Sequence, residues 1–196
     1  MKNLLLFAVL SLIGTALQAQ ERPAKYPISL SYFSHAVIHP GMKVGTQVDF
    51  KQWATEKEGK KATFTKTKSL FVSPQIGFFY LPGHRTNFLF NAEVGYNRWK
   101  SKRNTFSAWS IGLGYLLQSQ VNTLSVNLGD GSIGNENREW GSYFLPSLNY
   151  AFGRRISRRL DWFSKLSYGV QLSSNRGASS MAFADLGIRY YLTTNK

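Results

Sequence analysis

The chain contains no cysteine, which excludes disulfides and also the acylated cysteine of a lipoprotein. Acidic residues are scarce, since 10 Asp and Glu stand against 24 Lys and Arg and give a formal net charge of +14. Beyond residue 20 the chain has no run of about 18 apolar residues, which excludes a helical membrane anchor there. Its 196 residues suffice for one ordinary domain and are few for two.

The first 19 residues have the organisation of a secretory signal peptide. Lys2 supplies a positive charge, residues 4–13 form an apolar core, and residues 15–19 form a small-residue cleavage site. The apolar core of about ten residues is too short for a membrane-spanning helix, which takes about 20. A buried first helix is the alternative interpretation. We expect residues 1–19 to be removed and residues 20–196 to form a single exported domain.

The rest of the chain alternates between apolar and polar residues. In residues 88–97 the even positions, which form one parity, are apolar, as in Phe90, Val94 and Tyr96, whereas the odd positions, the other parity, hold polar residues such as Asn91 and Glu93. Residues 109–118 and 182–192 alternate in the same way. Successive side chains of a strand point to opposite faces, so each segment predicts a strand with one apolar and one polar face. A polar face rich in Gly, Ser, Asn and Gln is typical of a lipid-facing barrel with a polar interior.

Eight strands are predicted, and turn sequences such as His39-Pro40-Gly41 separate them. A chain without spanning helices crosses a membrane only as a closed barrel, because its backbone hydrogen bonds must all be made between strands. We therefore predict an all-β fold, an eight-stranded antiparallel transmembrane β-barrel after a cleaved signal peptide. The predicted strands cover residues 27–38, 42–53, 64–80, 87–99, 105–118, 139–152, 161–173 and 179–192.

Two prolines lie inside these predicted strands. Pro74 and Pro146 each remove one ladder hydrogen bond, so we expect a bulge at each, or a position above the hydrocarbon where water substitutes.

An even number of strands places both termini on one side of the membrane. With the C-terminus in the periplasm, residues 119–138 face outward and the basic turns near residues 100–103 and 154–159 face inward. Residues 54–63 would also face inward, although they are longer than a usual periplasmic turn. The basic turns form either a rim over phospholipid phosphates or a set of solvated turn residues.

Charged and amide side chains are expected to line the lumen. An eight-stranded barrel is just wide enough for side chains to fill it, and charges buried there must pair. We expect Lys165, on the adjacent strand, to be the partner of Asp185, with His35 as a second candidate. A structural network is favoured, and a small conducting pore is the alternative. The predicted lumen residues are Lys43, Gln47, Asp49, Lys51, Asn91, Glu93, Asn97, Lys165, Ser167, Gln171, Asp185 and Arg189.

Residues for catalysis or metal binding are sparse. Ser173-Ser174-Asn175 resembles part of the His-x-Ser-Asn site of outer-membrane lipid A deacylases, but Leu172 takes the place of the histidine. A serine nucleophile needs a base within reach, and no histidine follows His84. The stretch from Asp130 to Glu136 lacks the repeating spacing of a calcium loop. We predict no catalytic residues, no metal and no cofactor.

Aromatic residues gather near the ends of the predicted strands. Trp and Tyr settle at membrane interfaces, so a girdle is favoured over a plugged soluble core. The predicted girdle comprises Tyr80, Tyr96, Trp99, Trp140, Tyr150, Phe152, Trp162, Phe163 and Tyr190.

With its signal, alternating strands and terminal Gly187-Ile188-Arg189-Tyr190-Tyr191-Leu192, the chain resembles small outer-membrane β-barrel proteins of the OmpA and OmpX type. The resemblance covers about residues 27–192. It implies a β-barrel of the Gram-negative outer membrane, in families that include adhesins, stability proteins, lipid-modifying enzymes and subunits of larger complexes. For the function we favour a non-enzymatic membrane protein that acts through structure or loop-mediated interaction. The alternatives are a lipid A-modifying enzyme and a secreted soluble barrel that carries a small ligand.

The expected partners follow from export and charge. Because the protein is expected to be exported, we expect its Lys and Arg side chains to interact with outer-membrane lipids and lipopolysaccharide rather than with nucleic acid. The barrel-insertion machinery is an expected partner during assembly.

Leu186→Arg tests the predicted lipid-facing parity of the last strand. We expect it to hinder membrane insertion by about 2–4 kcal/mol if the side chain lies near the bilayer midplane, and Gly187→Ser, on the lumen parity, to be milder. Insertion into lipid vesicles measures both, and equal insertion would contradict the assignment.

Overall fold

A computed structural model describes residues 26–35, 39–58, 63–81, 85–122, 137–173 and 177–192. The predicted signal peptide, residues 1–19, lies outside the described residues. The described part of the chain contains no helix long and apolar enough to cross a bilayer. Its elements are β1 (Tyr26–His35), β2 (His39–Thr46), β3 (Val48–Glu58), β4 (Thr63–Leu81), β5 (Arg85–Lys100), the 3-10 helix η1 (Ser101–Arg103), β6 (Thr105–Asn122), β7 (Asn137–Ser157), β8 (Leu160–Ser173) and β9 (Gly177–Leu192).

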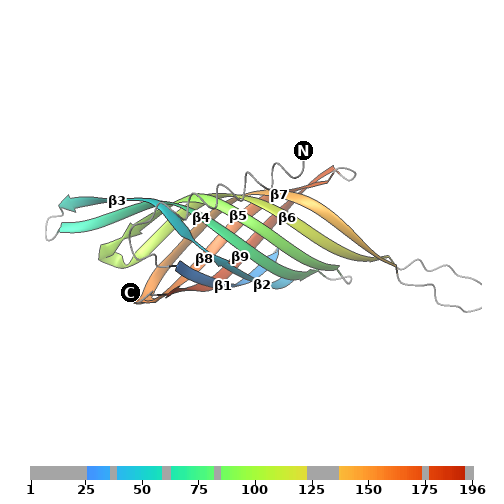
Figure 1. The fold of residues 1–196 in the computed structure, drawn as a ribbon, viewed down its shortest axis with the longest axis horizontal. Coiled ribbons are helices and arrows are strands. Elements are labelled where there is room, and N and C mark those ends of the chain that lie inside the picture. Colours follow the sequence, from blue (N-terminus) through green and yellow to red (C-terminus); the bar gives the residue numbers. More distant parts are fainter. Residues whose placement is uncertain are drawn as a thin grey trace, which may run out of the picture.

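The strands form a closed antiparallel ring (Figure 1). Hydrogen-bonded neighbours follow the order β2-β1-β9-β8-β7-β6-β5-β4-β3, and an additional pairing of β2 with β4 closes the ring. Only Gln47 separates β2 from β3, and both pair with β4, so together they form one strand of the barrel. The ring therefore has eight strands, which confirms the prediction.

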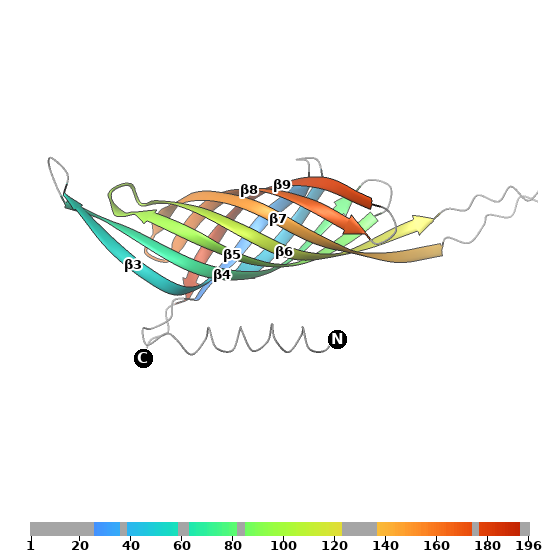
Figure 2. The ribbon, with the colours of Figure 1, turned by 90° about the horizontal axis from the view of Figure 1, so that it is seen from above.

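The barrel has two distinct ends. β1 begins and β9 ends at the terminal end, where β3 meets β4, η1 joins β5 to β6, and β7 meets β8. The opposite, or loop, end is where β6 meets β7 and β8 meets β9. At the terminal end β3 and β4 reach farther along the barrel than their neighbours (Figure 2).

The two prolines interrupt the ring without shifting it, so the predicted bulges are wrong. Pairing with β4 lapses opposite Pro74, which has no N–H to donate, and this lapse divides β2 from β3. The Thr46 carbonyl at this point accepts a hydrogen bond from the Ser73 hydroxyl at 2.7 Å. Near Pro146 the pairing of β7 with β8 lapses and resumes in the same register.

A bulge occurs instead in β3. The register of β3 on β4 shifts between Asp49 and Lys51, which makes Phe50 an extra residue. Because side chains alternate, one extra residue reverses the direction of those that follow. Lys51, predicted in the lumen, is therefore exposed, and Gln52 hydrogen-bonds Asp49 at 2.9 Å.

Large apolar side chains cover the outer face. On β9 Leu186 is 60% exposed, whereas its neighbour Asp185 is only 2% exposed. The same alternation leaves Ile111 of β6 and Leu166 of β8 exposed. A closed ring with this outer surface is a transmembrane β-barrel, since its backbone is paired between strands and its apolar face meets lipid.

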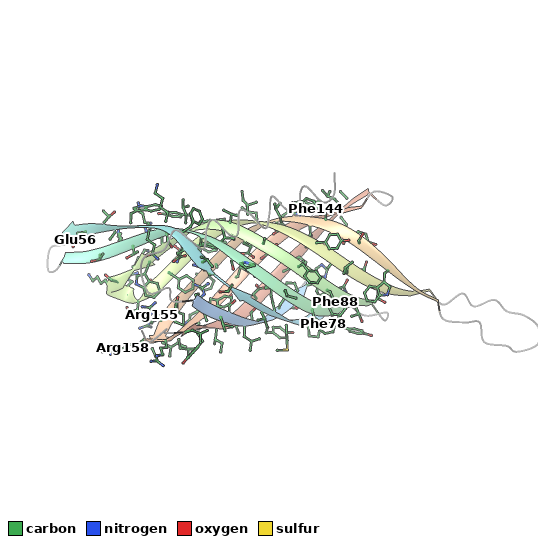
Figure 3. All side chains as sticks on the ribbon, viewed as in Figure 1. Glu56, Phe78, Phe88, Phe144, Arg155 and Arg158 are labelled. Atoms are coloured by element: carbon green, nitrogen blue, oxygen red, sulfur yellow. The ribbon has the colours of Figure 1, made fainter. Side chains whose placement is uncertain are left out.

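Aromatic rings on the outer face collect at two levels. Toward the loop end Phe78 lies near Phe88 (Figure 3), and their ring centroids are 5.6 Å apart. Toward the terminal end Phe152 and Trp162 meet edge to face at 6.0 Å. Phe163 is misplaced in the predicted girdle, because it is 5% exposed and lies inside the lumen.

Apolar residues also fill much of the lumen, which the predicted polar interior does not include. The cluster nearest the loop end includes Phe33 stacked on Phe183 at 5.0 Å and edge to face with Phe79 at 5.3 Å. Its members lie on the parity read as polar, so alternation alone did not reveal them. The buried cluster is Phe33, Phe79, Leu89, Leu116, Tyr143, Leu145, Met181 and Phe183.

The expected mildness of Gly187→Ser is wrong. A Cβ at Gly187 would lie 2.5 Å from the Leu30 carbonyl oxygen and 2.6 Å from the Ser31 Cβ. Neither neighbour can move without displacing β1, so this glycine permits the close approach of β1 and β9.

Leu192→Arg is the better control for Leu186→Arg. Leu192 is also exposed but ends β9, whereas Leu186 lies within the strand. The cost of arginine falls to about 0–1 kcal/mol near an interface, so we expect Leu192→Arg to insert nearly normally. Vesicle insertion followed by urea unfolding measures both variants. Equal costs at the two positions would contradict the depth assignment.

Candidate functional site

Four charged side chains from four strands meet inside the barrel. Lys43 of β2 forms an ion pair with Asp185 of β9. Lys165 of β8 lies 2.6 Å from Glu93 of β5 and 3.4 Å from Asp185, joining the two pairs into one network. Lys165 stands directly opposite Asp185 in the ladder between β8 and β9. The side chains of all four are at most 7% exposed.

Neutral polar groups complete the contacts of Glu93 and Lys165. One carboxylate oxygen of Glu93 accepts a hydrogen bond from Ser110 at 3.0 Å, and the other accepts one from Asn91 at 3.0 Å. The Lys165 ammonium also donates to the Gln75 side chain at 3.1 Å. Glu93 is therefore held by three donors, which compensates for its removal from water.

The network is neutral overall and tightly enclosed. Two ammonium groups face two carboxylates, and the Lys43 ammonium also lies 4.4 Å from the centroid of the Phe33 ring. The open space among the lining residues is about 30 Å³. Such a space holds a water molecule or two, which the Asp185 carboxylate could bind, rather than a substrate.

Arg189 and Asp49 lie apart from these ion pairs. Arg189 lines the same cavity, but its guanidinium stacks over Phe106 at 5.1 Å and Phe163 at 5.6 Å. Asp49 accepts hydrogen bonds from Gln47 at 2.8 Å and from Gln52 at 2.9 Å. Of the six predicted network residues, the structure thus brings four together.

A second ionic cluster at the terminal end was missed by the sequence analysis. Asp161 is fully buried, and its carboxylate binds the Arg155 Nε at 3.1 Å and the Tyr191 hydroxyl at 2.7 Å. The Arg155 guanidinium also lies over the Trp99 ring at 4.3 Å. This cluster joins the last residues of β9 to the β7–β8 turn. Arg155 and Asp161 are six residues apart and pair directly across the β7–β8 turn, so the register of this hairpin carried a signal for their ion pair. Tyr191 and Trp99 are distant in sequence, and local spacing carried no signal for their contacts.

Among the described residues the ion-pair partners of Asp185 are Lys43 and Lys165, and not His35, the second predicted candidate. His35 instead stacks on His39 with ring centroids 5.5 Å apart, near Phe183. Within the described ranges no three His, Cys, Asp or Glu side chains gather to hold a metal ion. His84, Ser174, Asn175 and residues 130–136 lie outside the described residues, and of Ser173 only the backbone is described.

No protein-family model and no curated protein matches this sequence. Among solved structures, the chain is similar to neisserial surface protein A, with a TM-score of 0.45 and 8% identity over 86% of this chain and 96% of that one. It is also similar to a protein from the de novo design of transmembrane β-barrels, with a TM-score of 0.43 and 12% identity over 88% of this chain and 99% of that one.

Asp185→Asn tests whether the network works by mutual neutralisation. The variant leaves the Lys43 ammonium buried without its partner, and we expect a loss of about 3–5 kcal/mol in the free energy of unfolding. Lys43→Met combined with Asp185→Asn restores neutrality and should recover most of that loss. Urea unfolding of the folded barrel in detergent measures both. Equal losses in the single and double variants would contradict neutralisation.

Proposed function

We propose that the protein is a non-enzymatic integral barrel of the Gram-negative outer membrane that acts through its structure or through its loops. The filled lumen carries this proposal. Buried aromatic residues and a neutral ionic network occupy the interior, and the described cavity there is about 30 Å³. The apolar outer face of the barrel contacts lipid, so the two ends of the barrel remain for contacts with other molecules.

Export and topology support the outer-membrane placement. The signal sequence directs the chain out of the cytoplasm, and barrels are the membrane-spanning fold that remains without spanning helices. Both described termini lie at one end, which we assign to the periplasm, so the end of the barrel where β6 pairs with β7 at Asn122 and Asn137 faces outward. Lipopolysaccharide on the outer side and the insertion machinery during assembly are the proposed partners.

A soluble ligand-binding barrel is the weaker alternative. Its outer face would place large apolar side chains such as Ile111, Leu166 and Leu186 in water. Heat-modifiable gel mobility of a membrane fraction separates the two, because folded membrane barrels resist detergent unless boiled. Protein that stays in solution without detergent and shows no heat-dependent mobility would contradict the membrane function.

A lipid A-modifying enzyme is the other alternative, and we predict that no such activity occurs. Serine nucleophiles need a base, and the two histidines in the described residues are packed against each other at the end of β1 and the start of β2. Mass spectrometry of lipid A from cells with and without the protein should show the same acyl chains. A changed acyl chain that is lost again with Ser173→Ala, Ser174→Ala or His84→Ala would overturn the non-enzymatic proposal.

A further inference from the structure

Four exposed arginines lie on two adjacent turns at the terminal end. The basic rim consists of Arg103, at the end of η1, and of Arg154, Arg158 and Arg159 around the β7–β8 turn. The two turns are fastened together, since the Arg155 N–H donates to the Asn104 carbonyl at 2.8 Å and Thr105 pairs with Arg154. The rim is therefore one surface with fixed spacing.

Among the described residues, no acid forms an ion pair with the arginines of the rim. Asp161, the acid nearest in sequence, is buried and engaged by Arg155 and Tyr191. Figure 3 shows Arg158 beside Arg155 at this end, and Glu56 on the separate β3–β4 hairpin. Within the part of the chain that the structure describes, these four arginines thus present positive charge that no ion pair compensates.

The rim begins where the aromatic level of the outer wall ends. Arg154 follows Phe152 by two residues on the same face, about 7 Å along the strand, and stands opposite Trp162 in the ladder with β8. Ile156, 60% exposed at the bulge in β7, adds apolar surface between the arginines. Cations directly beyond an aromatic belt lie at the depth of lipid headgroups, where arginine extends its guanidinium to phosphate.

We propose that the basic rim binds the phosphates of an anionic glycerophospholipid whose acyl chains lie along Phe152 and Trp162. The inference rests on the proposed membrane placement and adds a lipid class and a position to it. Guanidinium groups bind phosphate oxygens through paired hydrogen bonds, and the adjoining aromatic wall accepts acyl chains. A polyanion without acyl chains would use the cations but not the wall, so the juxtaposition favours a lipid over nucleic acid.

Lipid retention by the full mature barrel tests the proposal. The protein is reconstituted into vesicles with equal phosphatidylglycerol and phosphatidylcholine and extracted gently, and the retained lipids are counted by native mass spectrometry. We expect wild type to retain phosphatidylglycerol in excess. Arg154→Gln with Arg158→Gln should lower that excess about fivefold per arginine, the effect of one cation near an anionic surface. A wild-type ratio equal to that of the vesicle would overturn the proposal.

The matched control removes the same charge at the other end. Arg138 lies on β7 itself, about 50 Å along the strand from Arg154, and Arg85 begins β5 at the loop end. Arg85→Gln with Arg138→Gln should leave the phosphatidylglycerol excess unchanged, and an equal loss would show general charge attraction and overturn a specific site. If the rim variant fails to insert, Arg158→Gln alone, in the exposed turn, should still lower the excess, and no change would overturn the proposal.

Two further arms separate other ligands. Vesicles with lipid A in place of phosphatidylglycerol should give weaker arginine-dependent retention, and equal or stronger retention would overturn the glycerophospholipid assignment. Arginine-dependent binding of a single-stranded oligonucleotide with no lipid preference would also overturn it. Heat-modifiable mobility is recorded for each sample. Failure to insert into any lipid contradicts the membrane function, whereas insertion without lipid preference contradicts the rim proposal alone.

Discussion

The fold depends on one constraint, that backbone hydrogen bonds facing hydrocarbon must be made within the ring. In this chain β1 pairs with both β2 and β9, and the additional pairing of β2 with β4 meets the constraint by closing the ring. Pro74 shows that the ring tolerates one missing ladder bond, because the register is the same on both sides of the proline and the Ser73 hydroxyl donates to the freed Thr46 carbonyl. Closure, once achieved, determines which side chains face lipid and which must fill the lumen.

Filling the lumen is the second consequence of eight strands. Side chains from all sides meet in a space that holds little water, so a charge placed there needs its opposite within reach. Lys43, Glu93, Lys165 and Asp185 satisfy this requirement as a neutral set, and the Phe33 cluster fills the space toward the loop end. A stable interior of this kind leaves little space for a ligand, which is why the ends of the barrel carry the proposed interactions.

Strand positions and the lipid-facing parity could be predicted from the sequence, because both follow from a local period of two. The adjacency of Lys165 and Asp185 follows from the same reasoning applied to neighbouring strands. The apolar lumen cluster could not be predicted, since single apolar residues at the polar positions of a strand also occur as irregularities of an alternating pattern. The Phe50 bulge could not be predicted either, since an extra residue is recognised only from the register with the partner strand. Arg155 and Asp161 face each other across the β7–β8 turn, but the contacts with Tyr191 and Trp99 join residues far apart in the sequence, which no local pattern encodes.

The distribution of arginines separates structure from interaction at the terminal end. The Arg155 guanidinium forms an ion pair with the buried Asp161 carboxylate and lies over the Trp99 ring. Because Asp161 also binds the Tyr191 hydroxyl, this cluster holds the end of β9 to the β7–β8 turn. The neighbouring Arg154 and Arg158 are exposed, yet the cluster fixes where they stand relative to Phe152 and Trp162. Cations whose positions are already fixed lose less conformational entropy when they bind a ligand than mobile cations do. In the proposed role the buried cluster positions the rim for phosphates, so that the same arginine-rich turn both holds the end of β9 and meets the membrane surface.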